Sequence, residues 1–160
     1  IYRYAQGTLR KLVADVTISN AICFTPDRKH AHYTDTVTKQ IMRVELDPAT
    51  GWPSSDARVW LDLNSQGLSP DGAIVDASGA LWVALWGAGC VNVYAPDGAL
   101  IASHKISGKH ATCPAFGGPD LNNLFVTSAI QGIKGPQGDN GKTFCLPQLG
   151  QGQAEHQVIL

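Results

Sequence analysis

Three oxygen-bearing side chains occupy the same place in three similar segments of the chain. Asn20, Asp71 and Thr112 each follow a polar loop and begin a segment that turns and then enters a strand-like run. An amide carbonyl and a carboxylate are hard oxygen donors, which suit Ca²⁺, Mg²⁺ or Mn²⁺. If the three segments are arranged around one axis, their first side chains meet there. Asn20 and Asp71 are therefore candidate metal ligands, and Thr112 is a candidate substrate-binding residue of the same site.

Residue type alone leaves a second interpretation open. Asn and Asp often satisfy the backbone of turns, and Asn20 and Asp71 could do only that. Two donors are also too few for a dedicated Ca²⁺ site, which takes about 6–8 oxygen ligands, so a further carboxylate and water are required. The sequences Asp76–Gly79 and Pro96–Gly98 are interpreted as hairpin tips, where Asp and Gly serve backbone geometry.

The segments that must position these residues recur at the spacing of propeller blades. Their aromatic anchors Tyr33, Trp82 and Phe125 lie about 40 to 50 residues apart. Each unit offers about four short strands separated by turns, which is the strand count of one blade, and a propeller gathers equivalent loops around a central channel. The chain is therefore predicted to be all-β, a single partial β-propeller domain over residues 1–160 with about three to four four-stranded blades.

Two parts of the chain depart from this repeat. The N-terminal residues indicate a hairpin that turns at Gln6–Gly7. Residues 131–152, rich in Gly, Gln, Asn and Pro, are predicted to form a long surface loop region containing one strand, Thr143–Leu146. A final strand is expected at Val158–Leu160. Closed propellers usually have about four to eight blades, so either the chain is part of a longer one, which we favour, or copies associate to close the ring.

Composition and charge restrict the class of protein. The 44% apolar and 16% charged content argues for a folded chain. A formal charge of −1 provides no basic field for nucleic acid or an anionic membrane surface, and no apolar run approaches the roughly 18 residues of a spanning helix. The cysteines form no C-x-x-C pair and are interpreted as small buried thiols in a reducing compartment, so a cytoplasmic location is expected.

Other kinds of catalytic site find little support in the sequence. There is no G-x-S-x-G nucleophile elbow, no P-loop and no dinucleotide-binding glycine fingerprint, so covalent serine catalysis and nucleotide binding are not expected. His110 precedes Thr112 by two positions and is expected to be a solvated loop residue.

Several motifs taken together resemble the gluconolactonase family that includes regucalcin, also called senescence marker protein 30. The resemblance covers Tyr2 to about Ile133, and its motifs occur in the same order and at compatible spacing. They are Ile18-Ser19-Asn20-Ala21-Ile22, Tyr33-Thr34-Asp35-Thr36, Pro70-Asp71-Gly72-Ala73, Leu81-Trp82-Val83-Ala84, Ala115-Phe116-Gly117-Gly118 and Leu124-Phe125-Val126-Thr127-Ser128-Ala129. The chain differs from the family at Ala21, where glycine is usual, and at Cys113–Pro114, where Ser-Cys is usual.

The resemblance implies a six-bladed propeller with one divalent metal ion in its channel, Ca²⁺, Zn²⁺, Mg²⁺ or Mn²⁺, and hydrolysis of a sugar lactone. It also implies that Asn20 is a metal ligand and that Asp71 is both a ligand and the general base. Because the match is to the C-terminal half of such an enzyme, the third ligand, a glutamate, and the substrate-contacting arginine and asparagine are expected outside this chain. The alternative is a metal-binding propeller without lactonase activity, which acts as a binding or regulatory module.

Overall fold

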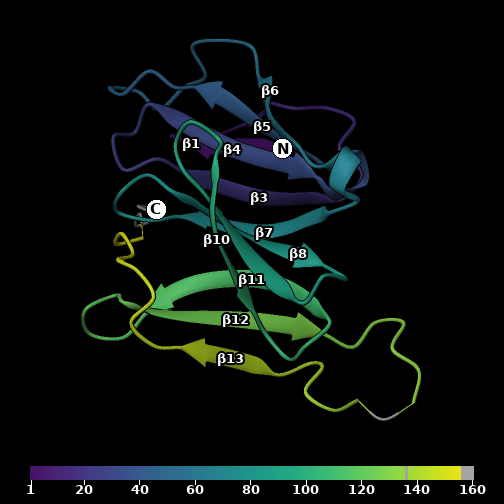
Figure 1. Cartoon of the computed structure of the whole chain (residues 1–160). Helices are drawn as coiled ribbons and strands as arrows, with labels where there is room; N and C mark the ends of the chain where they lie inside the picture. The colour runs from purple at the N-terminus through teal and green to yellow at the C-terminus, as the bar shows by residue number, and fades with distance from the viewer. Residues whose placement is uncertain (136, 156–160) are drawn as a thin grey trace.

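The computed structural model describes residues 1–135 and 137–155, which form short antiparallel strands gathered into a fan of sheets (Figure 1). A hairpin of β1 (Tyr2–Ala5) and β2 (Thr8–Lys11) comes first. The first blade contains β3 (Ser19–Phe24), β4 (His30–Asp35), β5 (Gln40–Glu45) and β6 (Arg58–Asp62). The second contains β7 (Ser69–Val75), β8 (Leu81–Trp86), β9 (Cys90–Tyr94) and β10 (Leu100–Lys105). The third contains β11 (His110–Gly117), β12 (Asn123–Ala129) and β13 (Thr143–Leu146).

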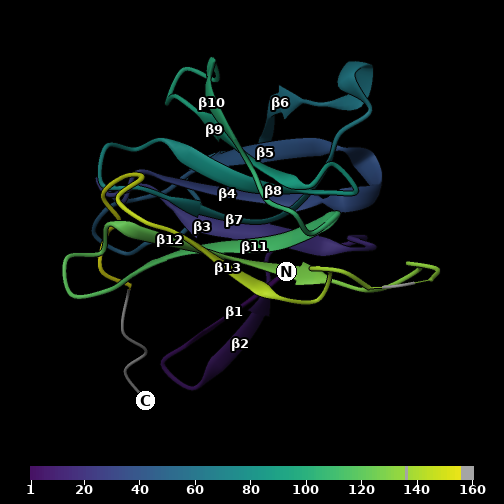
Figure 2. The same cartoon turned by 60° about the horizontal axis from the view of Figure 1, so that its bottom comes forward.

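Within each blade, strands that follow one another in sequence are hydrogen-bonded neighbours, as in a meander. The first strands of the three blades, β3, β7 and β11, pack side by side, so they form the inner edge of the fan. This arrangement confirms the prediction of an all-β partial propeller. Figure 2 shows that the β1–β2 hairpin stands apart from the three blades.

Two hydrophobic clusters hold the blades together, and the middle blade contributes to both. Alternate side chains of β8 point to opposite faces of the sheet. Leu81, Val83 and Leu85 belong to the cluster shared with the first blade, whereas Trp82 and Ala84 belong to the cluster shared with the third. β8 is therefore buried on both faces, which explains why its sequence is continuously apolar instead of alternating.

Some details of the fold differ from the sequence-based expectation or extend it. The sequence did not indicate two single-turn 3₁₀ helices, η1 (Thr36–Thr38) and η2 (Asn64–Gln66). The strand expected at Thr143–Leu146 is β13, and the strand expected at Val158–Leu160 lies outside the described residues. Among the described residues, none of the helices has the length and hydrophobicity needed to cross a bilayer.

Candidate functional site

Each of the three inner strands is irregular at the position of its candidate residue. The register shifts between Asn20 and Cys23 in the β3–β4 pair. It also shifts between Pro70 and Ala73 in the β7–β8 pair, and between Ala111 and Cys113 in the β11–β12 pair. A β-bulge bends a strand and changes the direction of the side chains next to it, and bulges are frequent beside active sites. The three segments are thus equivalent in backbone geometry as well as in sequence.

The bulge in the first blade explains the residue that follows Asn20. Ala21 adopts a φ of 56°, in the left-handed region that glycine enters without steric cost. An L-residue with a side chain pays about 1–2 kcal/mol for this conformation. The position where the sequence departs from the glycine of the resembling family is therefore one where the backbone favours glycine, and the turn is kept despite the substitution.

The amide of Asn20 is oriented by a hydroxyl from η1. Asn20 Nδ2 donates to Thr36 Oγ1 at 3.0 Å, and Thr36 Oγ1 donates to the carbonyl oxygen of Pro70 at 2.8 Å. Because the amide nitrogen is engaged, Asn20 Oδ1 is the atom left for a cation. The same hydroxyl holds the peptide that precedes Asp71. One side chain therefore positions both candidate ligands across the boundary between the first and second blades.

Thr36 is itself fixed by the residue before it. The Asp35 carboxylate accepts the backbone N–H groups of Thr17 at 2.8 Å, Ile18 at 3.0 Å and Val37 at 3.2 Å. It thereby ties the start of η1 to the loop that enters β3. These backbone hydrogen bonds hold the pKa of Asp35 below its usual range, so the carboxylate stays charged and acts as a structural acceptor.

Asp71 is half-buried in β7, and burial raises the pKa of its carboxyl group, opposed by a hydrogen bond from the Gly72 N–H. In the described part of the chain, no Lys, Arg or His forms an ion pair with it. Gly72 is required beside it, because a Cβ there would lie 2.7 Å from Thr112 O and 2.8 Å from Cys113 Sγ. The close contact of β7 with β11 therefore depends on Gly72 and places Asp71 on the inner edge. Its carboxyl group has no cationic partner among the described residues.

The geometry fits a divalent cation only in part. Asn20 and Asp71 offer an oriented carbonyl oxygen and an unpaired carboxylate on adjacent inner strands, which is a hard-donor set. Among the described residues, no group of three or more His, Cys, Asp or Glu side chains could hold a metal ion. The pair therefore fits as part of a coordination sphere that needs further oxygen ligands.

Thr112 lies in the third bulge, but its hydroxyl is engaged within its own blade. Thr112 Oγ1 and Thr127 Oγ1 are 2.7 Å apart, and Thr127 Oγ1 also donates to the carbonyl oxygen of Cys113 at 3.3 Å. Since the Thr127 proton is used for Cys113, Thr112 is the donor in the pair. Its oxygen can still accept a hydrogen bond, so a lining role for Thr112 at this site stays a prediction.

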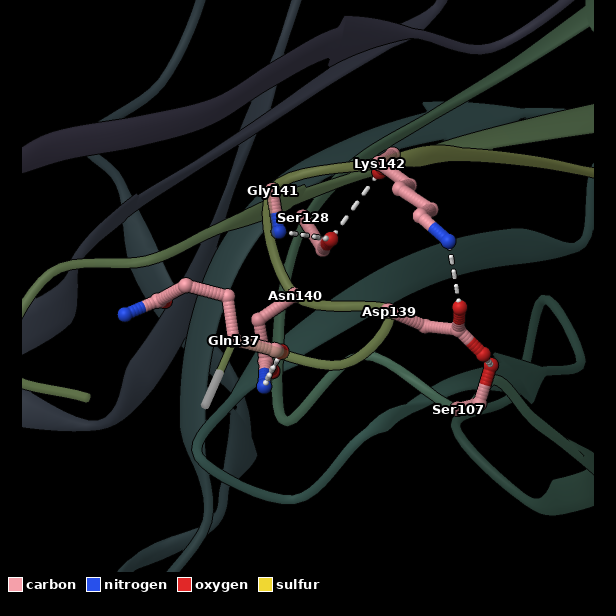
Figure 3. Close-up of polar contacts among 7 residues, drawn as sticks. All are labelled: Ser107, Ser128, Gln137, Asp139, Asn140, Gly141 and Lys142. Carbon is pink, nitrogen blue, oxygen red and sulfur yellow. Dashed lines mark hydrogen bonds and ion pairs between the residues drawn. The ribbon is translucent and has the colours of Figure 1, made fainter. Parts of the chain in front are cut away.

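The long connection between β12 and β13 is anchored at the end of the third blade where β11 begins. Figure 3 shows the polar contacts that anchor it. Asp139 Oδ2 accepts from Ser107 Oγ at 2.8 Å, and Asp139 Oδ1 accepts from Lys142 Nζ at 2.7 Å. Asn140 Oδ1 accepts the N–H of Lys109 at 2.7 Å. These contacts dock the connection onto the loop that enters β11.

Sequence reasoning was wrong about His110 and missed its partner. His110 is the first residue of β11 and is buried, with its ring stacked on Trp86 at a centroid distance of 4.2 Å and an angle of 17°. Because β11 begins at His110, the residue belongs to a strand and not to a loop, and its ring lies between the second and third blades. Two of the four thiols also differ from expectation, because Cys113 and Cys145 are exposed while Cys23 and Cys90 are buried.

We expect Thr36→Val to weaken Ca²⁺ binding about tenfold, because a residue that hydrogen-bonds to a metal ligand and orients it typically contributes at least that much to metal affinity. Valine keeps the shape of threonine but neither accepts from Asn20 nor donates to Pro70. Isothermal titration calorimetry of the metal-free protein measures the effect. Thr36→Ser should restore the affinity. Thr38→Val, which removes only the bond to the carbonyl oxygen of Asp35, is the matched control in the same turn. Equal Ca²⁺ affinity in Thr36→Val and wild type would show that the hydrogen bonds of Thr36 to Asn20 and Pro70 serve the fold and not metal binding.

The sequence is similar to known proteins over most of its length. A model of the SMP-30/gluconolactonase/LRE-like region matches residues 1–130. The chain is 43% identical over 150 residues to a Rhizobium meliloti (strain 1021) protein provisionally named a sugar lactone lactonase, covering 91% of this chain and 51% of that protein. It is 37% identical over 123 residues to the pentonolactonase of Haloferax volcanii, and the match covers 77% of this chain and 42% of that protein.

The solved structures agree with the sequence comparisons. The calcium-binding protein regucalcin of Agrobacterium tumefaciens strain C58 is similar, with a TM-score of 0.95 and 40% identity over 99% of this chain and 55% of that one. The chain spans about half the length of the curated relatives it matches.

Proposed function

Because the chain belongs to the SMP-30/gluconolactonase/LRE-like family, we propose that the complete protein is a lactonase that uses a divalent metal ion to hydrolyse a sugar lactone. The observation that carries this proposal is the pairing of an oriented Asn20 amide with an Asp71 carboxylate that has no cationic partner in the described part of the chain. Two relatives are named as lactonases, which supports a sugar lactone as the substrate.

In this mechanism Asp71 is the residue that moves a proton. Its carboxylate accepts a proton from the attacking water while oxygen bonds to the lactone carbonyl carbon. The ring C–O bond then breaks, and the leaving alkoxide oxygen takes the proton that Asp71 accepted, which gives the open-chain aldonic acid and restores the Asp71 carboxylate. A bound divalent ion supplies Lewis-acid polarisation of the lactone carbonyl. Asn20 contributes a neutral oxygen, which holds the cation without adding negative charge.

The remaining parts of the site belong to the same proposal. A third ligand, a carboxylate, and the residues that select the sugar are supplied by the other half of the ring, and Thr112 lines the site beside them. We infer Ca²⁺ as the ion to test first, because a regucalcin of similar structure is described as calcium-binding. A cytoplasmic location is part of the proposal, since all four thiols are free.

The test is hydrolysis of D-glucono-1,5-lactone and of a pentono-1,4-lactone, followed by acid release at constant pH. We expect turnover that falls at least tenfold after chelation and returns when Ca²⁺, Zn²⁺, Mg²⁺ or Mn²⁺ is added back. A protein that binds the ion tightly but shows no turnover of either lactone above the uncatalysed rate contradicts the proposal and favours the regulatory module.

A further inference from the structure

The β1–β2 hairpin places two guanidinium groups opposite each other on one face. Arg3 and Arg10 are directly paired in the register of the antiparallel ladder. Residues that pair in this way have side chains on the same face about 5 Å apart at Cβ, and like charges in such a pair are destabilising. The chain therefore carries a local repulsion that needs an explanation.

A tryptophan from the first blade holds both groups in place. The Arg3 guanidinium carbon lies 4.0 Å from the centroid of the Trp52 ring, and that of Arg10 lies 5.2 Å from it. Arg3 Nη2 also donates to the carbonyl oxygen of Thr50 at 2.8 Å. Cation–π contacts of this kind fix the plane and position of each guanidinium but do not neutralise its charge.

Neither arginine has a carboxylate partner among the described residues, where the ion pairs are Arg58–Glu45 and Lys142–Asp139. Arg3 Nη1 is buried and has no hydrogen-bond acceptor within that part of the chain. A buried donor left without a partner costs about 1–3 kcal/mol. Two guanidinium groups held in place and a donor without an acceptor are the features of a site that binds an anion.

A cavity of about 620 Å³ lies at this point, and both arginines line it together with Gln6, Thr8, Thr50 and Trp52. We propose that this arginine cavity binds a phosphate group, either free or as part of a phosphorylated small molecule. A phosphomonoester carries a charge of about −1.5 to −2 at pH 7, which matches two guanidinium groups. The guanidinium fork donates two parallel hydrogen bonds to phosphate oxygens.

The arginine cavity is separate from the candidate catalytic site. It lies between the hairpin and the β5–β6 connection of the first blade, whereas Asn20 and Asp71 lie on the inner strands β3 and β7. Phosphate binding there does not depend on lactone hydrolysis. A protein that failed the lactone assay could still bind phosphate, and the reverse also holds.

Isothermal titration calorimetry of the protein with inorganic phosphate and with glucose 6-phosphate tests the proposal. We expect saturable binding with one site per chain and at least a tenfold loss of affinity in Arg10→Gln. Arg10 is exposed, so this variant should fold, and a thermal melt checks it. Arg10→Lys, which keeps the charge but loses the fork, should bind with intermediate affinity.

Lys11→Gln is the matched control, because it removes the same charge from the opposite face of β2. It should change the affinity by less than twofold. Binding of both compounds identifies the phosphate group itself as the ligand, and binding of glucose 6-phosphate alone identifies the phosphorylated sugar. Absence of saturable binding to both, or equal losses in Arg10→Gln and Lys11→Gln, would overturn the proposal.

Discussion

Replacing Asp71 with asparagine is expected to lower kcat/KM for an aldonolactone by about 10³-fold while the propeller still folds. A positioned general base contributes about 10²- to 10⁴-fold, and asparagine cannot accept the proton of the attacking water. Among the described residues, Asp71 is the only carboxylate on the inner strands β3, β7 and β11, so Ca²⁺ affinity should fall with the rate. Rates measured at saturating metal separate the loss of the base from the loss of the ion.

The stability of the metal-free variant provides an independent check on Asp71→Asn. Burial raises the pKa of Asp71, so its ionised form costs stability above the folded pKa, and this cost disappears as the carboxyl group is protonated at acid pH. At pH 7 the free energy of unfolding of the metal-free variant should therefore equal or exceed that of metal-free wild type. Near pH 3 the two proteins should be equally stable.

Asp120→Asn serves as the charge-matched control for Asp71→Asn. Asp120 is an exposed residue in the turn between β11 and β12, at the far end of the third blade, and this change should leave turnover unaltered. Lactone turnover by Asp71→Asn within tenfold of wild type would show that another group activates the water.

The sequence was sufficient for the architecture because blade periodicity is a local signal. Aromatic anchors, turns and strand lengths repeat along the chain, and the sheets follow them. The same repeat identified Asn20 and Asp71 as equivalent, and the structure places both on adjacent inner strands with register shifts beside them.

What the sequence could not supply depends on contacts between separate blades. The hydrogen bonds from Asn20 to Thr36 and from Thr36 to Pro70 join two blades, and although Thr36 and Pro70 each lie in a motif, neither motif indicates that the two residues contact each other. The stack of His110 on Trp86 likewise requires two strands from different blades. The positive φ of Ala21 was detectable only as a departure from an expected glycine.

The aspartates interpreted as residues of hairpin tips differ in burial and in how many hydrogen bonds their carboxylates accept. Asp76 is buried and accepts four, whereas Asp97 is exposed and accepts one. Asp76 Oδ1 accepts from Ser78 N at 2.8 Å, Ser78 Oγ at 2.6 Å and Ala80 N at 3.0 Å. Its Oδ2 accepts from the indole Nε1 of Trp82 at 2.8 Å. The turn that Asp76 closes also seats the C-terminal segment, because Ala77 N donates to Gln151 O and Asp76 forms a bridge with Gly152.

Asp76→Ala is therefore expected to lower the free energy of unfolding by about 3–5 kcal/mol, since each buried donor left without an acceptor costs about 1–3 kcal/mol. Urea denaturation followed by tryptophan fluorescence measures the loss. Asp97→Ala is the matched control, because Asp97 closes the equivalent exposed turn with a single bond from Ala99 N at 3.0 Å, and its loss should cost about 0.5–1.5 kcal/mol. Equal costs at the two turns would mean that the Trp82 and Ala80 donors find other acceptors. A turn carboxylate would then serve local backbone geometry alone, as the sequence first suggested, and would not hold the middle blade together.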